Sequence, residues 1–204
     1  MQSSAECQIL RMPDSDIALY PSLFDLAESD RLFHDLLTNT DWRHDAIQIY
    51  GRQIPLPRLT AWYGDPGVSY TYSQIKMEPS PWTPSLLSIK DRIESVAEVS
   101  FNSVLLNLYR DGRDGVSWHQ DDEPELGKNP VIGSVSFGET RTFQLRHKSR
   151  KDLGIVNIDL SRGSFLLMSG PTQHFWRHRL PKTPKVVNPR VNLTFRNISP
   201  NPSS

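Results

Sequence analysis

The stretch SWHQDDE, residues 117–123, places His119 two positions before Asp121. On an extended segment, residues i and i+2 point to the same side, so this imidazole and carboxylate can reach one metal ion from a single strand end. An H-x-D pair often occurs by chance, and a metal site also needs a third ligand from another part of the chain. Two histidines and one carboxylate that leave open metal positions are typical of non-haem Fe(II) oxygenases.

The third ligand has to come from the remaining histidines. His34 lies in a predicted helix and His44 near a loop, whereas His147 lies in RHKSRK, a basic stretch typical of a solvated turn. His174 and His178 both lie in GPTQHFWRHRLP, between two predicted strands. Their spacing of four puts them on one face of either a strand or a helical turn, so spacing does not choose between them.

Two arginines mark the last predicted strand, PRVNLTFR. Arg190 and Arg196 are an even number of residues apart, so they point to the same side, and apolar residues alternate on the other side. Burying both without partners would be costly. They therefore either face water on an edge strand or bind an anion, such as a carboxylate that the planar guanidinium can hold through two hydrogen bonds.

The chain has the size and composition of one globular domain: 204 residues, 37% hydrophobic and 23% charged. No apolar run approaches the roughly 20 residues of a membrane span. The single cysteine, Cys7, and a start without a secretory pattern favour the cytoplasm, or the nucleus in a eukaryote. The net charge is zero, but residues 1–100 hold 8 Lys/Arg against 14 Asp/Glu, a balance of −6, which leaves +6 on residues 101–204. A basic half can face a polyanion, although soluble domains often carry uneven charge without such a partner.

The elements that must position these side chains fall into two parts. Apolar residues at near-helical spacing predict helices over residues 22–42 and 83–99, and Thr83 is placed to cap the second. After residue 100, short β-rich runs with turn signals and no intervening helix predict a sandwich or jelly roll. Residues 136–143, SFGETRTF, are typical of a hairpin turn within it.

Together these motifs resemble the AlkB family of Fe(II)/2-oxoglutarate-dependent dioxygenases, and most of all the branch with the mammalian DNA-repair members. The match runs in the family's order through YGDPGVSYTYS, NLYRDG, WHQDDE, VIGSVSFGETRTFQLRHK, GSFLLMSGPTQ, WRHRLP and PRVNLTFR. The resemblance implies an α+β, mainly β fold: a double-stranded β-helix (jelly roll) whose N-terminal helices and strands form a substrate lid. We expect a loosely ordered arm over 1–20, an extension carrying the lid over 21–99, the catalytic core over 100–198 and a tail over 199–204.

The resemblance also implies roles for residues. The family places its distal histidine just before an LP or VP dipeptide, so the metal ligands would be His119, Asp121 and His178. Arg190 would pair with the distal carboxylate of 2-oxoglutarate. The residues of the co-substrate pocket would be Asn107, Tyr109, Arg190, Thr194 and Arg196. The residues that contact the substrate would be Tyr50, Tyr70, Tyr72, Asp122 and Glu123.

The implied activity is oxidative demethylation of N-alkylated bases such as 1-methyladenine and 3-methylcytosine. It uses Fe(II), 2-oxoglutarate and O2, and it releases formaldehyde, succinate and CO2. The expected partner is methylated DNA, with RNA as a further candidate, and the protein would act as a monomer without a membrane. Two alternatives stay open: the same iron chemistry on a protein or lipid, and a metal- or nucleic-acid-binding module without turnover.

Overall fold

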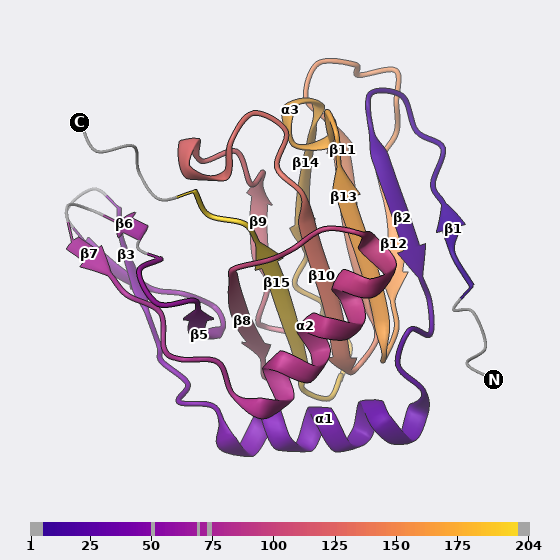
Figure 1. Ribbon diagram of the computed structural model, residues 1–204. Helices are drawn as coiled ribbons and strands as arrows, with labels where there is room; N and C mark the ends of the chain where they lie inside the picture. The colour runs from indigo at the N-terminus through magenta and orange to yellow at the C-terminus, as the bar shows by residue number, and fades with distance from the viewer. Residues whose placement is uncertain (1–5, 50–51, 69, 73–74, 200–204) are drawn as a thin grey trace.

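Two antiparallel sheets form the body of the protein in this computed structural model, which describes residues 6–49, 52–68, 70–72 and 75–199 (Figure 1). The larger sheet has seven strands, in the order β1 (Gln8–Ile9), β2 (Asp16–Tyr20), β13 (Ser164–Ser169), β10 (Ile132–Gly138), β15 (Arg190–Arg196), β8 (Ser103–Tyr109) and β5 (Leu59–Gly64). The smaller sheet has four, in the order β12 (Val156–Leu160), β11 (Arg141–His147), β14 (Trp176–Leu180) and β9 (Val116–His119). This arrangement confirms the mainly β fold with a jelly-roll body.

Both predicted helices are present and both begin at a side-chain cap. Helix α1 (Leu26–Asn39) begins at Asp25, whose carboxylate accepts a hydrogen bond from the Glu28 amide at 2.8 Å. Helix α2 (Pro84–Ala97) begins at Thr83, whose hydroxyl accepts one from the Leu86 amide at 3.3 Å, as the sequence predicted. Figure 1 shows α2 lying across the larger sheet, with α1 beneath it.

Two hydrophobic cores divide the interior. The first lies between the helices and the larger sheet and includes Leu32, Ile89 and Leu193. The second lies between the two sheets and joins residues such as Leu145 of β11 and Leu166 of β13. The second core draws on β2, β10, β11, β12, β13 and β14 but on no residue of β5, β8 or β15. The space beside those three strands is therefore left for a cavity.

The expectation of a loosely ordered arm over residues 1–20 is wrong for the part that the structure describes. Strand β2 pairs with β13 from Asp16 to Tyr20, and Ile17 and Leu19 are buried in the second core. Strand β1 in turn pairs with β2. The alternation of apolar residues over 16–20 is the strand signal that marks this segment, because it puts one face toward the core.

The connection at residues 136–143 is not a hairpin. β10 ends at Gly138 in the larger sheet, and β11 begins at Arg141 in the smaller sheet, so the chain crosses between sheets there. Turn-forming residues predict a reversal but do not say which sheet the next strand joins. The region after residue 100 also contains two short helical turns, the 3-10 helix η1 (Pro124–Leu126) and α3 (Thr172–Phe175).

Two small hairpins stand apart from the sheets at one side of the molecule (Figure 1). One pairs β3 (Ala46–Ile49) with β4 (Arg52–Pro55), and the other pairs β6 (Tyr70–Tyr72) with β7 (Ile75–Met77). Between them in sequence, β5 joins the larger sheet beside β8. The segment 21–99 is therefore continuous with the body of the fold. None of the helices among the described residues is long and apolar enough to cross a membrane.

Candidate active site

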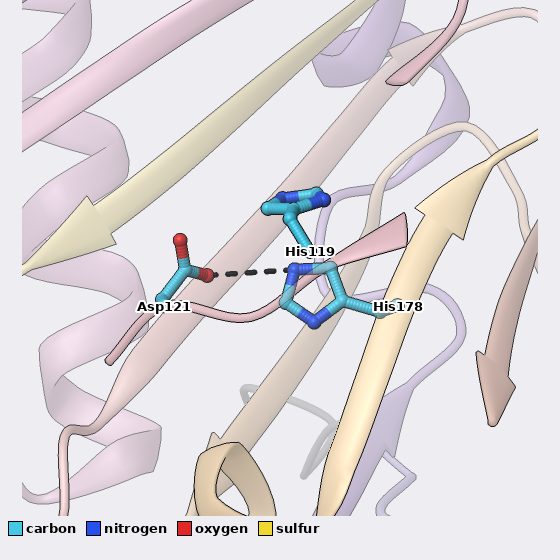
Figure 2. A group of neighbouring side chains, drawn as sticks. All are labelled: His119, Asp121 and His178. Atoms are coloured by element: carbon cyan, nitrogen blue, oxygen red, sulfur yellow. Dashed lines mark ion pairs between the residues drawn. The ribbon is translucent and has the colours of Figure 1, made fainter. Parts of the chain in front are cut away.

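His119, Asp121 and His178 converge between the two sheets (Figure 2). His119 is the last residue of β9, Asp121 follows two positions later, and His178 lies on β14 directly opposite His119. One ligand atom from each residue lies within 4.8 Å of the other two, and His178 Nε2 is 3.5 Å from Asp121 Oδ2. This set has the donor chemistry of the two-histidine, one-carboxylate face predicted from the sequence.

The structure also separates the two histidines that spacing left open. His174 lies in the short helix α3, where it is exposed and hydrogen-bonds Asn129 at 3.0 Å, whereas His178 lies on β14 and is buried. A change from helix to strand between them removes the shared face. His147 is not in a solvated turn: it is buried at the end of β11, and its Nε2 is 3.2 Å from Asp14 Oδ2.

Charge and burial leave Asp121 and His178 in the protonation states that could bind a metal ion. Burial would raise the pKa of Asp121, but the positive charge of Arg196 and the two neighbouring histidines outweigh it and lower that pKa to about 2. Arg196 donates to Asp121 Oδ1 at 2.6 Å. Burial lowers the pKa of His178 to about 3. At neutral pH the carboxylate is therefore charged and the imidazole neutral, which is what metal coordination requires.

Neighbouring groups fix the orientation of this cluster. His119 Nδ1 lies 2.8 Å from the carbonyl of Ser117, a bond that puts the proton on Nδ1 and leaves Nε2 to coordinate. The Asp121 amide donates to Gln173 Oε1 at 3.0 Å. Gln173 is fully buried and was missed by the sequence reasoning, because a glutamine 52 positions away carries no local signal.

A cavity of about 670 Å³ opens beside the three residues. Its floor is the polar face of β15 and β8, where Arg190 lies opposite Tyr109 and Asn192 opposite Asn107. The alternate residues of β15, such as Leu193, are buried in the first core. Arg190, Asn192, Thr194 and Arg196 all line the cavity, so the two arginines share a face as their even spacing predicted.

Arg190 is a buried cation that faces this cavity without an acidic partner among the described residues. It is 2% exposed, its Nη2 donates to Ser136 Oγ at 2.9 Å, and its Nε has no hydrogen-bond partner. Burial lowers its pKa to about 10. Strand β15 lies between β10 and β8, so the exposed edge strand that the sequence left open is excluded. The guanidinium also lies over the ring of Tyr109, with its Cζ 5.4 Å from the ring centre. A buried guanidinium that has no acidic partner among the described residues fits an anionic ligand such as the far carboxylate of 2-oxoglutarate.

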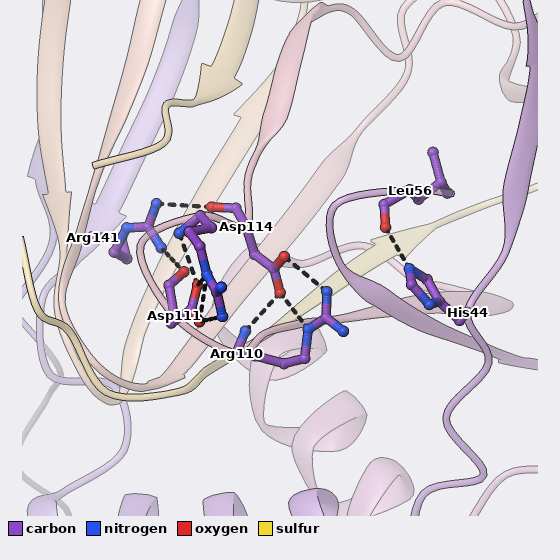
Figure 3. A network of polar contacts seen from close by, with 7 residues as sticks. His44, Leu56, Arg110, Asp111, Asp114 and Arg141 are labelled. Atoms are coloured by element: carbon purple, nitrogen blue, oxygen red, sulfur yellow. Dashed lines mark hydrogen bonds and ion pairs between the residues drawn. The ribbon is translucent and has the colours of Figure 1, made fainter. Parts of the chain in front are cut away.

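Hydrogen bonds hold the loop that follows Tyr109, at the end of the cavity where Arg190 lies (Figure 3). The backbone amide, Nε and Nη2 of Arg110 all donate to the carboxylate of Asp114, at 2.8 to 3.0 Å. Arg141 donates to the carbonyls of Asp114 and Pro181 at 3.1 and 2.7 Å. These bonds join the loop to the start of β11 and the end of β14, and so hold the cavity wall in place.

The substrate-side residues differ in their placement. Glu123 is half-buried, lines the cavity and has an Oε2 without a hydrogen-bond partner, and burial raises its pKa. Asp122 is exposed and does not line the cavity. Tyr70 and Tyr72 lie on β6, whereas Tyr50 falls outside the described residues.

Comparison with known proteins agrees with this geometry. The model of the 2OG-Fe(II) oxygenase superfamily matches residues 16–196. The chain is 46% identical over 196 residues to alpha-ketoglutarate-dependent dioxygenase alkB homolog 3 of Mus musculus, covering 92% of this chain and 68% of that protein. It is 42% identical over 188 residues to DNA oxidative demethylase ALKBH2 of Homo sapiens, covering 88% of this chain and 72% of that protein.

Among solved structures, the one titled "The structure of OsALKBH1" shares the fold, with a TM-score of 0.66 at 20% identity over 94% of this chain and 100% of that one. The family match over most of the chain and the identity to alkB homolog 3 and ALKBH2 are stronger evidence for the family than the shared fold. They agree with the convergent triad and with the unpaired arginine in the cavity. The chain therefore belongs to the AlkB family of Fe(II)- and 2-oxoglutarate-dependent dioxygenases, in the branch that includes the mammalian DNA-repair members.

Proposed function

We propose that this dioxygenase removes methyl groups from N-alkylated bases of nucleic acid, with 1-methyladenine and 3-methylcytosine in DNA as its main substrates. The observation that carries the proposal is that the three metal-facing residues, the unpaired Arg190 and the acidic Glu123 open into one cavity. Its volume of about 670 Å³ lies in the range of small-molecule sites and offers room for a co-substrate beside a base. The name of the Mus musculus relative supports the dioxygenase chemistry, and the name of the Homo sapiens relative, a DNA oxidative demethylase, supports the substrate class.

In this proposal His119, Asp121 and His178 hold Fe(II). Iron held there would supply, together with 2-oxoglutarate and O2, the oxidising chemistry that converts the N-methyl group to formaldehyde and restores the base. The protein's own task is positioning. Arg190 would bind the distal carboxylate of the co-substrate. Asn107, on the neighbouring strand, would donate a hydrogen bond to the co-substrate.

Recognition of the base would rest on charge and stacking. Glu123 lines the cavity and its Oε2 has no protein partner, so its carboxylate would suit a methylated base that carries a positive charge. Tyr70 and Tyr72 on β6 would provide aromatic faces, each worth about 1–3 kcal/mol per stacked base. The base must leave the stack to enter, which costs less for a lesion that does not pair.

We also propose that methylated RNA is a second substrate, because the recognition proposed for Glu123 uses the charge of the base and not the sugar. We propose, in addition, that the protein acts as a monomer. The exposed free thiol of Cys7 is compatible with a reducing compartment, the cytoplasm or a nucleus.

A substrate panel tests the proposal. Oligonucleotides with 1-methyladenine or 3-methylcytosine, as single-stranded DNA, duplex DNA and RNA, are incubated with Fe(II) and 2-oxoglutarate, and formaldehyde and succinate are measured. We expect equal amounts of both products with methylated oligonucleotides, and no formaldehyde with unmethylated ones or with His119→Ala. Failure on every oligonucleotide, with co-substrate still consumed, would favour a protein or lipid substrate. Binding that survives His119→Ala in a protein that never consumes 2-oxoglutarate would favour a module without turnover.

A further inference from the structure

Arg58 contacts Asn107, one of the residues on the floor of the cavity. It directly precedes β5, and it follows the β3–β4 hairpin. Its Nε donates to Asn107 Oδ1 at 2.7 Å, across 49 positions of sequence. Asn107 is 6% exposed, and both residues line the cavity.

This bond decides which end of the Asn107 amide faces the cavity. A guanidinium has hydrogen-bond donors and no acceptor, so Asn107 has to turn its oxygen toward Arg58 and its nitrogen away. Among the described residues, no hydrogen bond uses Asn107 Nδ2. Asn107 also lies directly between Asn192 and Thr60 in the register, on the face of the sheet that lines the cavity. The amide therefore presents a donor to whatever the cavity holds.

We infer that Arg58 is a positioning residue for 2-oxoglutarate, which acts by holding Asn107 with its NH2 group toward the co-substrate. Without Arg58 the amide is free to turn over and present its oxygen to a dianion, an arrangement that repels the ligand. This inference rests on the proposed use of the cavity as the co-substrate pocket. It adds a link between the segment that joins the β3–β4 hairpin to β5 and the site proposed for the co-substrate.

The direct test is Arg58→Met, with 2-oxoglutarate binding measured by calorimetry on protein loaded with Mn(II), without nucleic acid. We expect the Kd to rise by about tenfold, the effect of losing one hydrogen bond to a charged group. The KM for 2-oxoglutarate should rise in parallel, while kcat at saturating co-substrate changes by less than about threefold. Arg58→Lys keeps a donor and should recover part of the loss, and it replaces Arg58→Met if that variant does not fold. An unchanged Kd in both variants overturns the inference.

Two further variants separate positioning from plain attraction between charges. Arg43→Met removes a positive charge from the lining of the same cavity, and its side chain has no hydrogen bond to Asn107. We expect its Kd for 2-oxoglutarate to stay within about twofold of the parent. In an Asn107→Leu background, Arg58→Met should cause no further loss, because the two residues act as one unit.

A tenfold loss that persists in the Asn107→Leu background, or that Arg43→Met reproduces, would show that Arg58 acts through its charge alone and would overturn the inference. Since these measurements need no oligonucleotide, they test the role of Arg58 independently of the proposed substrate. If no methylated base is demethylated but the binding results hold, the proposed substrate is wrong and the role of Arg58 stands.

Discussion

Removing Arg190 should make the ligand-free protein more stable, not less. Burial lowers the pKa of Arg190 to about 10, well below its usual value, which corresponds to about 3 kcal/mol against the charged form. Because the folded pKa lies below the unfolded one, the charge disfavours folding at neutral pH, and this penalty declines only as the pH rises past about 10. Arg190→Met keeps an unbranched stem and loses about 1 kcal/mol from the hydrogen bond to Ser136 and about 1 kcal/mol from the cation–π contact with the Tyr109 ring. The net gain is up to about 1 kcal/mol, or a Tm higher by roughly 2–4 °C.

The assay is thermal unfolding of the parent and of Arg190→Met, each with Mn(II), with and without 2-oxoglutarate. Co-substrate at about one hundred times its Kd should stabilise the parent by about 2.7 kcal/mol and should not change the Tm of the variant. Arg162→Met is the control, since Arg162 is on the surface and pairs with Asp30. A variant that melts several degrees below the parent without ligand, or that keeps the parent's shift with 2-oxoglutarate, would refute the reasoning.

Three further outcomes are expected. Glu123→Gln should lower kcat/KM by about tenfold for cationic 1-methyladenine but little for neutral 1-methylguanine, and equal losses on the two oligonucleotides would contradict a role in charge recognition. Burial would raise the pKa of Asp114, but the hydrogen bonds from Arg110 outweigh it and lower that pKa. Asp114→Asn should therefore cost about 1–3 kcal/mol in urea unfolding at pH 7. This difference in unfolding free energy between the parent and Asp114→Asn is fully present above the pKa of Asp114 in the unfolded chain, and it shrinks as the pH falls through the lower pKa of the folded protein. A difference that stays constant down to pH 3 would count against this role of Asp114. Thr83→Ala should cost about 1 kcal/mol by the same method through loss of the cap on the Leu86 amide, and an unchanged midpoint would speak against this cap.

The features that could be predicted are those with a local physical cause. The cap at Thr83 follows from a hydroxyl before a helical pattern, and the shared face of Arg190 and Arg196 follows from the period of a strand. The approach of His119 to Asp121 has the same origin. In each case the residues are near neighbours in sequence, so backbone geometry alone fixes their relation.

The features that could not be predicted depend on tertiary pairing. The choice of His178 over His174 depends on a change from helix to strand between them, and only the family resemblance anticipated it. The burial of His147 follows from its place on the inner face of β11, two residues after Leu145, although the charges around it suggested solvent. The bond between Arg58 and Asn107 joins distant segments, for which the sequence holds no local signal.

The most direct test of the account is the stoichiometry and affinity of Fe(II) binding, measured by anaerobic equilibrium dialysis on the parent and on single variants. His178→Ala and Asp121→Ala should abolish binding of one Fe(II) per chain, because each removes one of the three converging ligands. His174→Ala, four positions from His178 and hydrogen-bonded to Asn129 instead, should bind as the parent does. Binding that survives the loss of His178, or that is lost with His174, would contradict the site described.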